Sequence, residues 1–339
     1  MSTSETYNDS HRACLEAFWS RGSWTYADSR ALLAGILTAH ASRTPRTDSS
    51  DNPDVEPVGP EDISEQIFNS FTAAAAETVA KYDFQIRSTV HQISGERVWA
   101  IVNTTSDFTQ DATQHTPEEM AFIKRVLEAM FDSYNTPRAE VMAITSMQAL
   151  KLARPRPQQQ QQQQPQQPQQ PQQNGASVNP SSDDGDGENT AMVNDDTILN
   201  ATTQTTAADK GLKLNEAEAV LGSLVSGGWF ELSPAAYYSL TPRALMELRA
   251  WLLATFNDPD VPAGEWQRIK SCEACRDIIT TGQRCGNRDC IVRLHDRCED
   301  AYWRTRRDKN CPRCERPWDG GAFVGERAVI GRAVRGRSG

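Results

Sequence analysis

The most constraining feature of this chain is a cluster of cysteines near its C-terminal end. Seven of the eight cysteines and one of the five histidines fall between residues 272 and 314. Three of the gaps between neighbouring members are two residues long, a spacing that lets both side chains reach one metal ion. The candidate ligands are Cys272, Cys275, Cys285, Cys290, His295, Cys298, Cys311 and Cys314. Because a structural zinc ion takes four such ligands, the pattern predicts two Zn²⁺ ions.

A disulfide framework is the alternative use of so many cysteines. The first ten residues, however, lack the basic and apolar regions of a secretory signal, and no apolar run reaches the length of a membrane span. We therefore expect a reducing intracellular setting, free thiols and bound metal. The segment 272–314 is too short to bury a core of its own. Each zinc ion should therefore contribute about 10 to 16 kcal/mol to the folding of this segment. With all four positions of each metal filled by protein, both ions are expected to be structural rather than hydrolytic.

The ligand order narrows the choice of zinc fold. Four cysteines, one histidine and three cysteines occur both in a RING variant and in PHD-type readers of histone tails, and both folds are cross-braced. In that arrangement Cys272 and Cys275 share one ion with His295 and Cys298, and the other four ligands share the second. PHD modules usually have an aromatic residue two positions before the seventh ligand, where this chain has Lys309. The sequence therefore favours a RING-like module, with the PHD-like reader as an alternative.

The N-terminal part of the chain alternates helical and strand patterns. The expected elements are two helices within 11–42, a helix over 63–82, strands at 85–93 and 97–103, and a helix whose capping box begins at Thr116. Helices followed by a two-stranded hairpin are typical of a winged-helix domain. We expect this first domain to cover residues 1–136.

A similar pattern follows after a segment of biased composition. The expected elements are a helix over 138–153, a helix capped by Asn215, a hairpin at 229–232 and 236–240, and a last helix from Thr241. They predict a second winged-helix domain over 137–265. Residues 154–209 are rich in Gln and Pro and then in Ser, Asp, Gly and Thr, and cannot bury enough apolar surface to offset the entropy of ordering. We expect them to be a disordered insertion.

The complete prediction is an α+β multidomain protein. The tandem winged-helix domains are followed by a cross-braced RING-like zinc domain over 266–319 and by a disordered Arg/Gly tail over 320–339. Charge is unevenly distributed, since the chain carries a formal charge of -10 whereas residues 266–339 hold seventeen basic and ten acidic residues. The helices before the two hairpins hold one lysine and no arginine. The winged helices are therefore expected to bind proteins, and DNA only indirectly.

Several segments together resemble one family. The segments are IRSTVHQISGERVWAIVNTTSD, TPEEMAFIKRVLEAMF, YYSLTPRALMELRAWL and the C-terminal Cys/His cluster. They are similar to the non-structural maintenance of chromosomes element 1 family, the RING-type subunits of the structural maintenance of chromosomes 5/6 complex. The resemblance implies a nuclear tandem winged-helix protein that binds a MAGE-type subunit and a kleisin subunit in DNA repair and recombination. It also implies E3 ubiquitin-protein ligase activity.

A RING ligase has no catalytic residue and works by positioning a ubiquitin-charged conjugating enzyme for attack by a substrate lysine. The resemblance places the conjugating-enzyme contacts at Ala274, Trp303 and Pro312. For Trp303, packing in the core of the small module is the alternative role. The position of the usual basic linchpin holds Glu315, and Arg316 comes one residue late. Weak intrinsic activity, stimulated by a partner, is therefore expected. The alternative from another class is a purely structural subunit.

Overall fold

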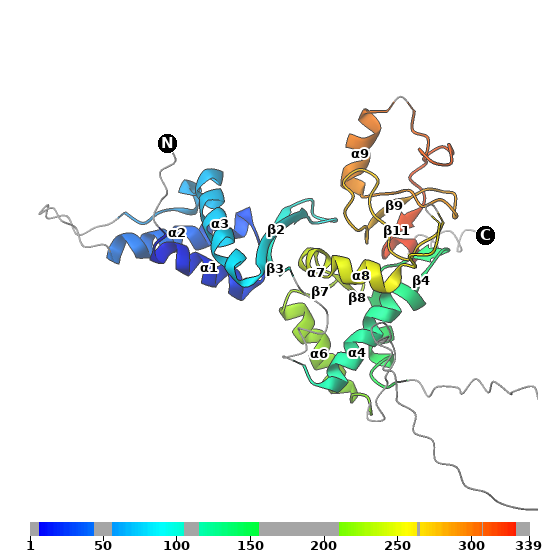
Figure 1. Cartoon of the computed structure of the whole chain (residues 1–339), viewed down its shortest axis with the longest axis horizontal. Coiled ribbons are helices and arrows are strands. Elements are labelled where there is room, and N and C mark those ends of the chain that lie inside the picture. Colours follow the sequence, from blue (N-terminus) through cyan, green and yellow to red (C-terminus); the bar gives the residue numbers. More distant parts are fainter. Residues whose placement is uncertain are drawn as a thin grey trace, which may run out of the picture. The chain divides into compact units, whose positions relative to one another are not determined.

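A computed structural model of the chain describes residues 7–43, 56–104, 115–155, 210–262, 265–306 and 308–329 (Figure 1). Apart from Pro155, these residues belong to one unit of the chain. The predicted insertion lies outside the described residues from position 156 onward, as do residues 330–339 of the predicted tail. None of the described helices combines the length and apolar character that crossing a membrane requires.

The N-terminal module packs three helices against a three-stranded antiparallel sheet of order β1-β3-β2. Its elements are α1 Asp9–Arg21, β1 Ser23–Thr25, α2 Tyr26–Arg43, the 3-10 turns Pro60–Asp62 and Ala80–Tyr82, α3 Glu65–Val79, β2 Phe84–Val90 and β3 Arg97–Asn103. The predicted helices and both predicted strands are confirmed. Phe18 stacks on Trp24 with ring centroids 4.0 Å apart, in a core that also holds Leu33, Phe68 and Phe71. Strand β1 escaped prediction because three residues are too few to show a period of two.

A second core is built from the elements that follow. These are α4 Pro117–Glu128, a π-helical turn Ala129–Ser133, β4 Asn135–Thr136, β5 Ala139–Glu140, β6 Ile144–Thr145, α5 Ser146–Lys151, α6 Leu214–Ser226, β7 Phe230–Leu232, β8 Tyr237–Leu240, α7 Pro242–Glu247 and α8 Arg249–Phe256. Its sheet is antiparallel, with order β6-β8-β7. Helices on both sides of the undescribed segment thus share one core, as expected for an insertion within a domain.

The predicted boundary at residue 136 is wrong in one respect, because α4 belongs to the second core. Its buried residues Phe122 and Val126 lie in the same cluster as Leu221 and Leu224 of α6. Figure 1 shows helices α4 and α6 as neighbours. The capping box at Thr116 is present, as predicted. A capping box and an apolar stripe identify a helix, but they do not say which core the stripe faces. The core of the N-terminal module ends with β3.

The helix predicted over 138–153 is also partly wrong. Residues Ala139–Glu140 instead form β5, which pairs with β4, and Ile144–Thr145 form β6, which pairs with β8. A helix begins only at Ser146, because the hydroxyl of Thr145 accepts a hydrogen bond from the Gln148 backbone and the Gln148 side chain accepts one in return. Strand pairing with distant residues therefore overrides the helical pattern of the first half.

Two predicted helix starts near the second hairpin have different outcomes. Asn215 is not the cap of α6, which begins at Leu214 with Lys213 as its N-cap residue. Thr241 caps α7 as predicted, but the helix is interrupted at Leu248 and restarts as α8.

The C-terminal module contains little regular structure. Its elements are β9 Gly282–Arg284, β10 Arg293–Leu294, α9 Asp296–Arg304 and β11 Phe323–Val324, with the sheet order β10-β9-β11. The predicted disordered tail from residue 320 is therefore corrected, because Phe323 pairs with Gln283 and Val324 with Gly282. Ile269, Ile278 and Val324 of this module are buried in the second core. The two modules share apolar packing, so a boundary at 265/266 does not separate their cores.

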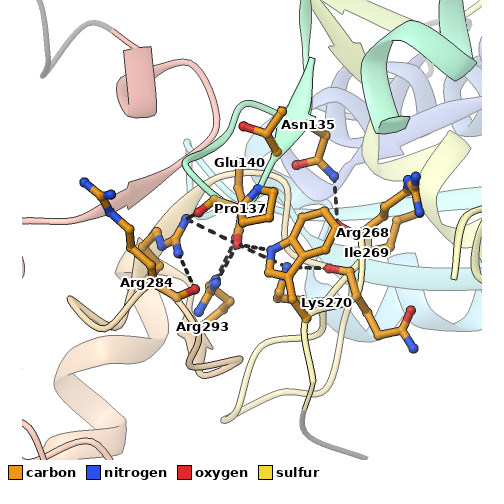
Figure 2. A network of polar contacts seen from close by, with 12 residues as sticks. Asn135, Pro137, Glu140, Arg268, Ile269, Lys270, Arg284 and Arg293 are labelled. Carbon is orange, nitrogen blue, oxygen red and sulfur yellow. Dashed lines mark hydrogen bonds and ion pairs between the residues drawn. The ribbon is translucent and has the colours of Figure 1, made fainter. Parts of the chain in front are cut away.

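A buried carboxylate fastens the C-terminal module to the second core. Figure 2 shows Glu140 of β5 surrounded by Arg284, Arg293 and Lys270. Arg293 is fully buried and donates to both carboxylate oxygens, from Nε at 2.7 Å and from an Nη at 2.5 Å. The Nε1–H of Trp266 donates to Oε1 at 3.1 Å. All four partners belong to the C-terminal module. The Glu140 side chain therefore connects four residues of that module to the second core.

Glu140 and Lys270 of this cluster both have shifted pKa values. Burial alone would raise the pKa of Glu140, but the hydrogen bonds and charge of Arg293, helped by Lys270 and Arg284, lower it to about 2. Burial lowers the pKa of Lys270 to about 8, against the attraction of Glu140 and with the repulsion of Arg293 and Arg284. One anion therefore faces three cations, and burial disfavours the charge of Lys270.

A second polar contact joins the C-terminal module to the N-terminal hairpin. The side-chain oxygen of Gln92 accepts hydrogen bonds from the backbone N–H groups of Thr280 and Thr281, both at 2.9 Å. Its side-chain nitrogen donates to Ile278 O at 3.0 Å. The Gln92 amide thus both accepts hydrogen bonds from this loop and donates one to it. These contacts fix the position of the hairpin relative to the loop.

We predict that Glu140→Ala lowers the free energy of unfolding by about 3 to 5 kcal/mol, because it leaves several buried cations unpaired. Lys270→Met should cost much less or be stabilising, since Glu140 keeps both arginines and the excess of positive charge falls. Urea unfolding followed by tryptophan fluorescence measures both. Equal losses in the two variants would contradict the assigned role of Glu140.

Candidate metal centre

The eight predicted ligands lie in two groups of four. One group contains Cys272, Cys275, His295 and Cys298, and the other contains Cys285, Cys290, Cys311 and Cys314. Within each group the ligand atoms lie within 4.8 Å of one another. The pairs alternate along the chain between the two groups, which confirms the predicted cross-braced arrangement of these residues. All eight cysteines lie in the described ranges, and none of them forms a disulfide there.

The spacing of the ligand atoms fits tetrahedral zinc. In the first group, His295 Nδ1 lies 3.3 Å from Cys275 Sγ and 3.9 Å from Cys298 Sγ. In the second, the sulfurs of Cys285 and Cys314 are 3.4 Å apart, and those of Cys290 and Cys311 are 3.5 Å apart. A tetrahedron with Zn–S bonds of about 2.3 Å has edges of about 3.8 Å. Both donor sets therefore suit a zinc ion with little movement.

Two loops with the same backbone pattern present the paired cysteines. In the first loop the N–H of Arg276 donates to Cys272 O at 2.9 Å, and in the second the N–H of Glu315 donates to Cys311 O at 2.9 Å. Arg276 and Glu315 have positive φ angles of 66° and 57°, a left-handed conformation that non-glycine residues rarely adopt. This turn folds each loop so that both sulfurs point to one side.

Helix α9 supplies the remaining pair of the first group. His295 is its N-cap residue, and Cys298 lies one turn later, so both side chains reach the same side of the helix. The N–H of His295 points to Cys272 Sγ at 3.5 Å. The histidine is fully buried, which holds its ring in one orientation.

Trp303 has the environment of its alternative role, which is packing in the core of the module, and not that of an exposed conjugating-enzyme contact. It is 5% exposed and packs against Trp318 with ring centroids 5.6 Å apart. It therefore belongs to the core of the C-terminal module and does not present its ring to a conjugating enzyme. Ala274 and Pro312, by contrast, are exposed on the two cysteine loops, and so is Glu315.

Sequence reasoning missed the residues that orient the second ligand group. Arg293 donates from one nitrogen to Cys290 O at 2.6 Å and to Val292 O at 2.7 Å, while its other nitrogens bind Glu140. The loop that carries Cys290 is thereby tied to β5 of the second core. A lone glutamate and a lone arginine 153 residues apart carry no periodic or spacing signal that could have revealed this pair.

Two family models match the chain. The model described as "Nse1 non-SMC component of SMC5-6 complex" matches residues 11–248, and the model of a RING-like domain matches residues 272–314. The second range begins and ends at the first and last of the eight ligands.

Relatives and a solved structure agree with these matches. The "Non-structural maintenance of chromosomes element 1 homolog" proteins of Bos taurus and Homo sapiens are 27% and 26% identical over 129 residues, or 38% of this chain. The match spans only 43% of the length of either relative. A chain of an "Nse1-Nse3-Nse4 complex" has a similar fold, with a TM-score of 0.58 and 20% identity over 93% of this chain and 98% of that chain.

The N-terminal family model covers well over half of the residues, and the module with the two ligand groups is matched separately as a RING-like domain. On these grounds the chain belongs to the family of Nse1 non-SMC components of the SMC5-6 complex.

Proposed function

We propose that this chain is a RING-type E3 ubiquitin-protein ligase subunit that acts in the nucleus, in DNA repair and recombination. The observation that carries the proposal is the pair of cross-braced ligand groups whose cysteine loops expose Ala274 and Pro312. Such a surface positions a ubiquitin-charged conjugating enzyme, and the substrate lysine attacks the thioester without a covalent intermediate on this chain. No catalytic residue is required of the RING-like module.

Each ligand group would hold one structural Zn²⁺ ion. Its four protein ligands fill the coordination sphere, so the ion would supply folding free energy and no reactive water. The small apolar cluster around Trp303 and Trp318 supports this role, because apart from cysteines it contains only Val292, Leu294 and Tyr302 as further buried residues among those described.

Tandem winged-helix domains account best for the rest of the described chain. Each core combines helices with a three-stranded antiparallel sheet whose last two strands form a hairpin, β2–β3 in one and β7–β8 in the other. The solved Nse1-Nse3-Nse4 complex contains a chain of similar fold. By analogy, the partners of this chain would be a MAGE-type subunit and a kleisin subunit, with DNA contacted through the complex.

A structural subunit without ligase activity is the second candidate function. It is favoured by the burial of Trp303 and by Glu315 at the position where a cation is expected. Ubiquitin transfer measured with and without the MAGE-type partner separates the two, since only a ligase responds to the partner. A PHD-like histone reader is not supported, because Lys309 stands where PHD modules usually have an aromatic residue.

Metal analysis of the purified chain should find two zinc ions. Cys285→Ser should remove one ion and loosen the other site, because the two ligand groups are interleaved along the chain. Cys14→Ala is the matched control, since Cys14 is fully buried in the N-terminal core. Its loss should leave the zinc content at two. Fewer than two ions in the correctly folded parent chain would reject the assignment.

Pro312→Ala should lower ubiquitin transfer severalfold while zinc content and partner binding stay unchanged, because Pro312 is exposed and cannot bind metal. Pro60→Ala, at an exposed proline of the N-terminal module, should leave transfer unaltered. The measurement is a single-turnover transfer assay with the MAGE-type partner present.

Glu315→Arg should raise transfer and reduce its dependence on the partner. A cation at this exposed position can donate charge-assisted hydrogen bonds that bridge enzyme and ubiquitin. If neither Pro312→Ala nor Glu315→Arg alters transfer in folded, zinc-loaded protein, the structural candidate replaces the ligase.

A further inference from the structure

A pocket beside the first metal-ligand group lies where three parts of the chain meet. Its volume is about 300 Å³, and it is lined by residues of β2, of the α7–α8 region and of the first cysteine loop with the start of α9. Three arginines line it, namely Arg87, Arg249 and Arg297. Asp277 is the one acidic residue among the described residues that line it.

Within the described part of the chain, the structure shows no ion pair between any of the three arginines and a carboxylate. Arg249 donates to Arg276 O at 3.0 Å, and Arg87 donates to the side-chain oxygen of Gln85 at 3.1 and 3.2 Å. The Nε–H of Arg297 is buried without a hydrogen-bond partner among the described residues. With Asp277 included, the lining side chains carry a net charge of about +2 at neutral pH.

One residue that lines this pocket has a buried nitrogen without a partner among the described residues. His295 is fully buried and lines it, and its Nδ1 faces the sulfurs of Cys275 and Cys298. Its other nitrogen, Nε2, therefore points away from the ligand group, and it has no hydrogen-bond partner among the described residues. When Nδ1 binds a metal, the ring proton is on Nε2, and a metal-bound histidine ordinarily donates that proton to an acceptor.

The N-terminal end of helix α9 adds to the positive potential of the pocket. The helix begins at Asp296, directly after His295, and its first N–H groups carry partial positive charge. The carboxylate of Asp296 is paired with Arg327. Its charge is therefore offset by a cation that does not line the pocket.

We propose that this pocket binds a phosphate monoester on a phosphorylated side chain of a protein partner. A phosphomonoester carries about -1.5 to -2 charges and three acceptor oxygens, which matches the lining charge and the available donors. A carboxylate or a nucleic-acid phosphodiester carries only one charge. Because three segments enclose the pocket, it admits a group that projects from a chain, whereas duplex DNA presents a continuous row of phosphates to an open surface.

Binding there would join the N-terminal hairpin, the second core and the first cysteine loop. A ligand that binds only the folded arrangement stabilises it by mass action. Phosphoserine should therefore raise the thermal unfolding midpoint of the full zinc-loaded chain, and acetate at the same ionic strength should not.

The direct test is calorimetric titration of O-phosphoserine into the full zinc-loaded chain at 0.15 M salt. Arg249→Gln and Arg297→Gln should each weaken binding roughly ten- to a hundredfold, as expected for a lost charged hydrogen bond. Arg304→Gln is the matched control, because it removes the same charge from an exposed position of α9 that does not line the pocket. Zinc content is measured for each variant, and Arg249 has the advantage of lying far in sequence from any metal ligand.

Three results would overturn the proposal. The first is phosphoserine binding that is unchanged in Arg249→Gln. The second is an equal loss in Arg304→Gln, which would indicate a general charge effect. The third is a short DNA duplex whose binding, unlike that of phosphoserine, depends on Arg249 and Arg297, which would make the ligand a diester.

Discussion

The Glu140 carboxylate is the interaction on which the arrangement of the C-terminal half depends. Apolar contacts of Ile269, Ile278 and Val324 with the second core contribute burial, but apolar packing has little directional preference. The two hydrogen bonds between Glu140 and Arg293 are directional, and Arg293 also binds the carbonyl oxygen of Cys290. One buried ion pair therefore sets the position of a metal-ligand loop relative to the second core (Figure 2).

The RING-like module is joined to the second core by the contacts of Glu140 and by apolar packing. Gln92 adds a second attachment, from the N-terminal hairpin to the loop of Thr280 and Thr281. Catalysis by positioning gains from such attachment, because a bound conjugating enzyme would be held at one place relative to the partners. A structural subunit would gain from it equally, so the two proposed functions differ only in the use made of the surface around Ala274 and Pro312.

The structure also divides the basic residues of the C-terminal segment by role. Arg284 and Arg293 are buried and bind Glu140, whereas Arg297 lines the pocket together with Arg87 and Arg249. Lys270 is likewise buried against Glu140. The excess of positive charge counted along the sequence is therefore not a measure of a nucleic-acid-binding face.

Local patterns in the sequence determined the candidate metal ligands, the hairpin of β2 and β3 and the capping box of α4. Each depends on residues close along the chain, where spacing alone fixes which side chains can meet. Tertiary structure decided that α4 packs in the second core, that residues 139–145 pair as strands, and that Trp303 is buried. It also decided that Glu140 meets Arg293, because burial and pairing between distant segments leave no periodic trace in either one.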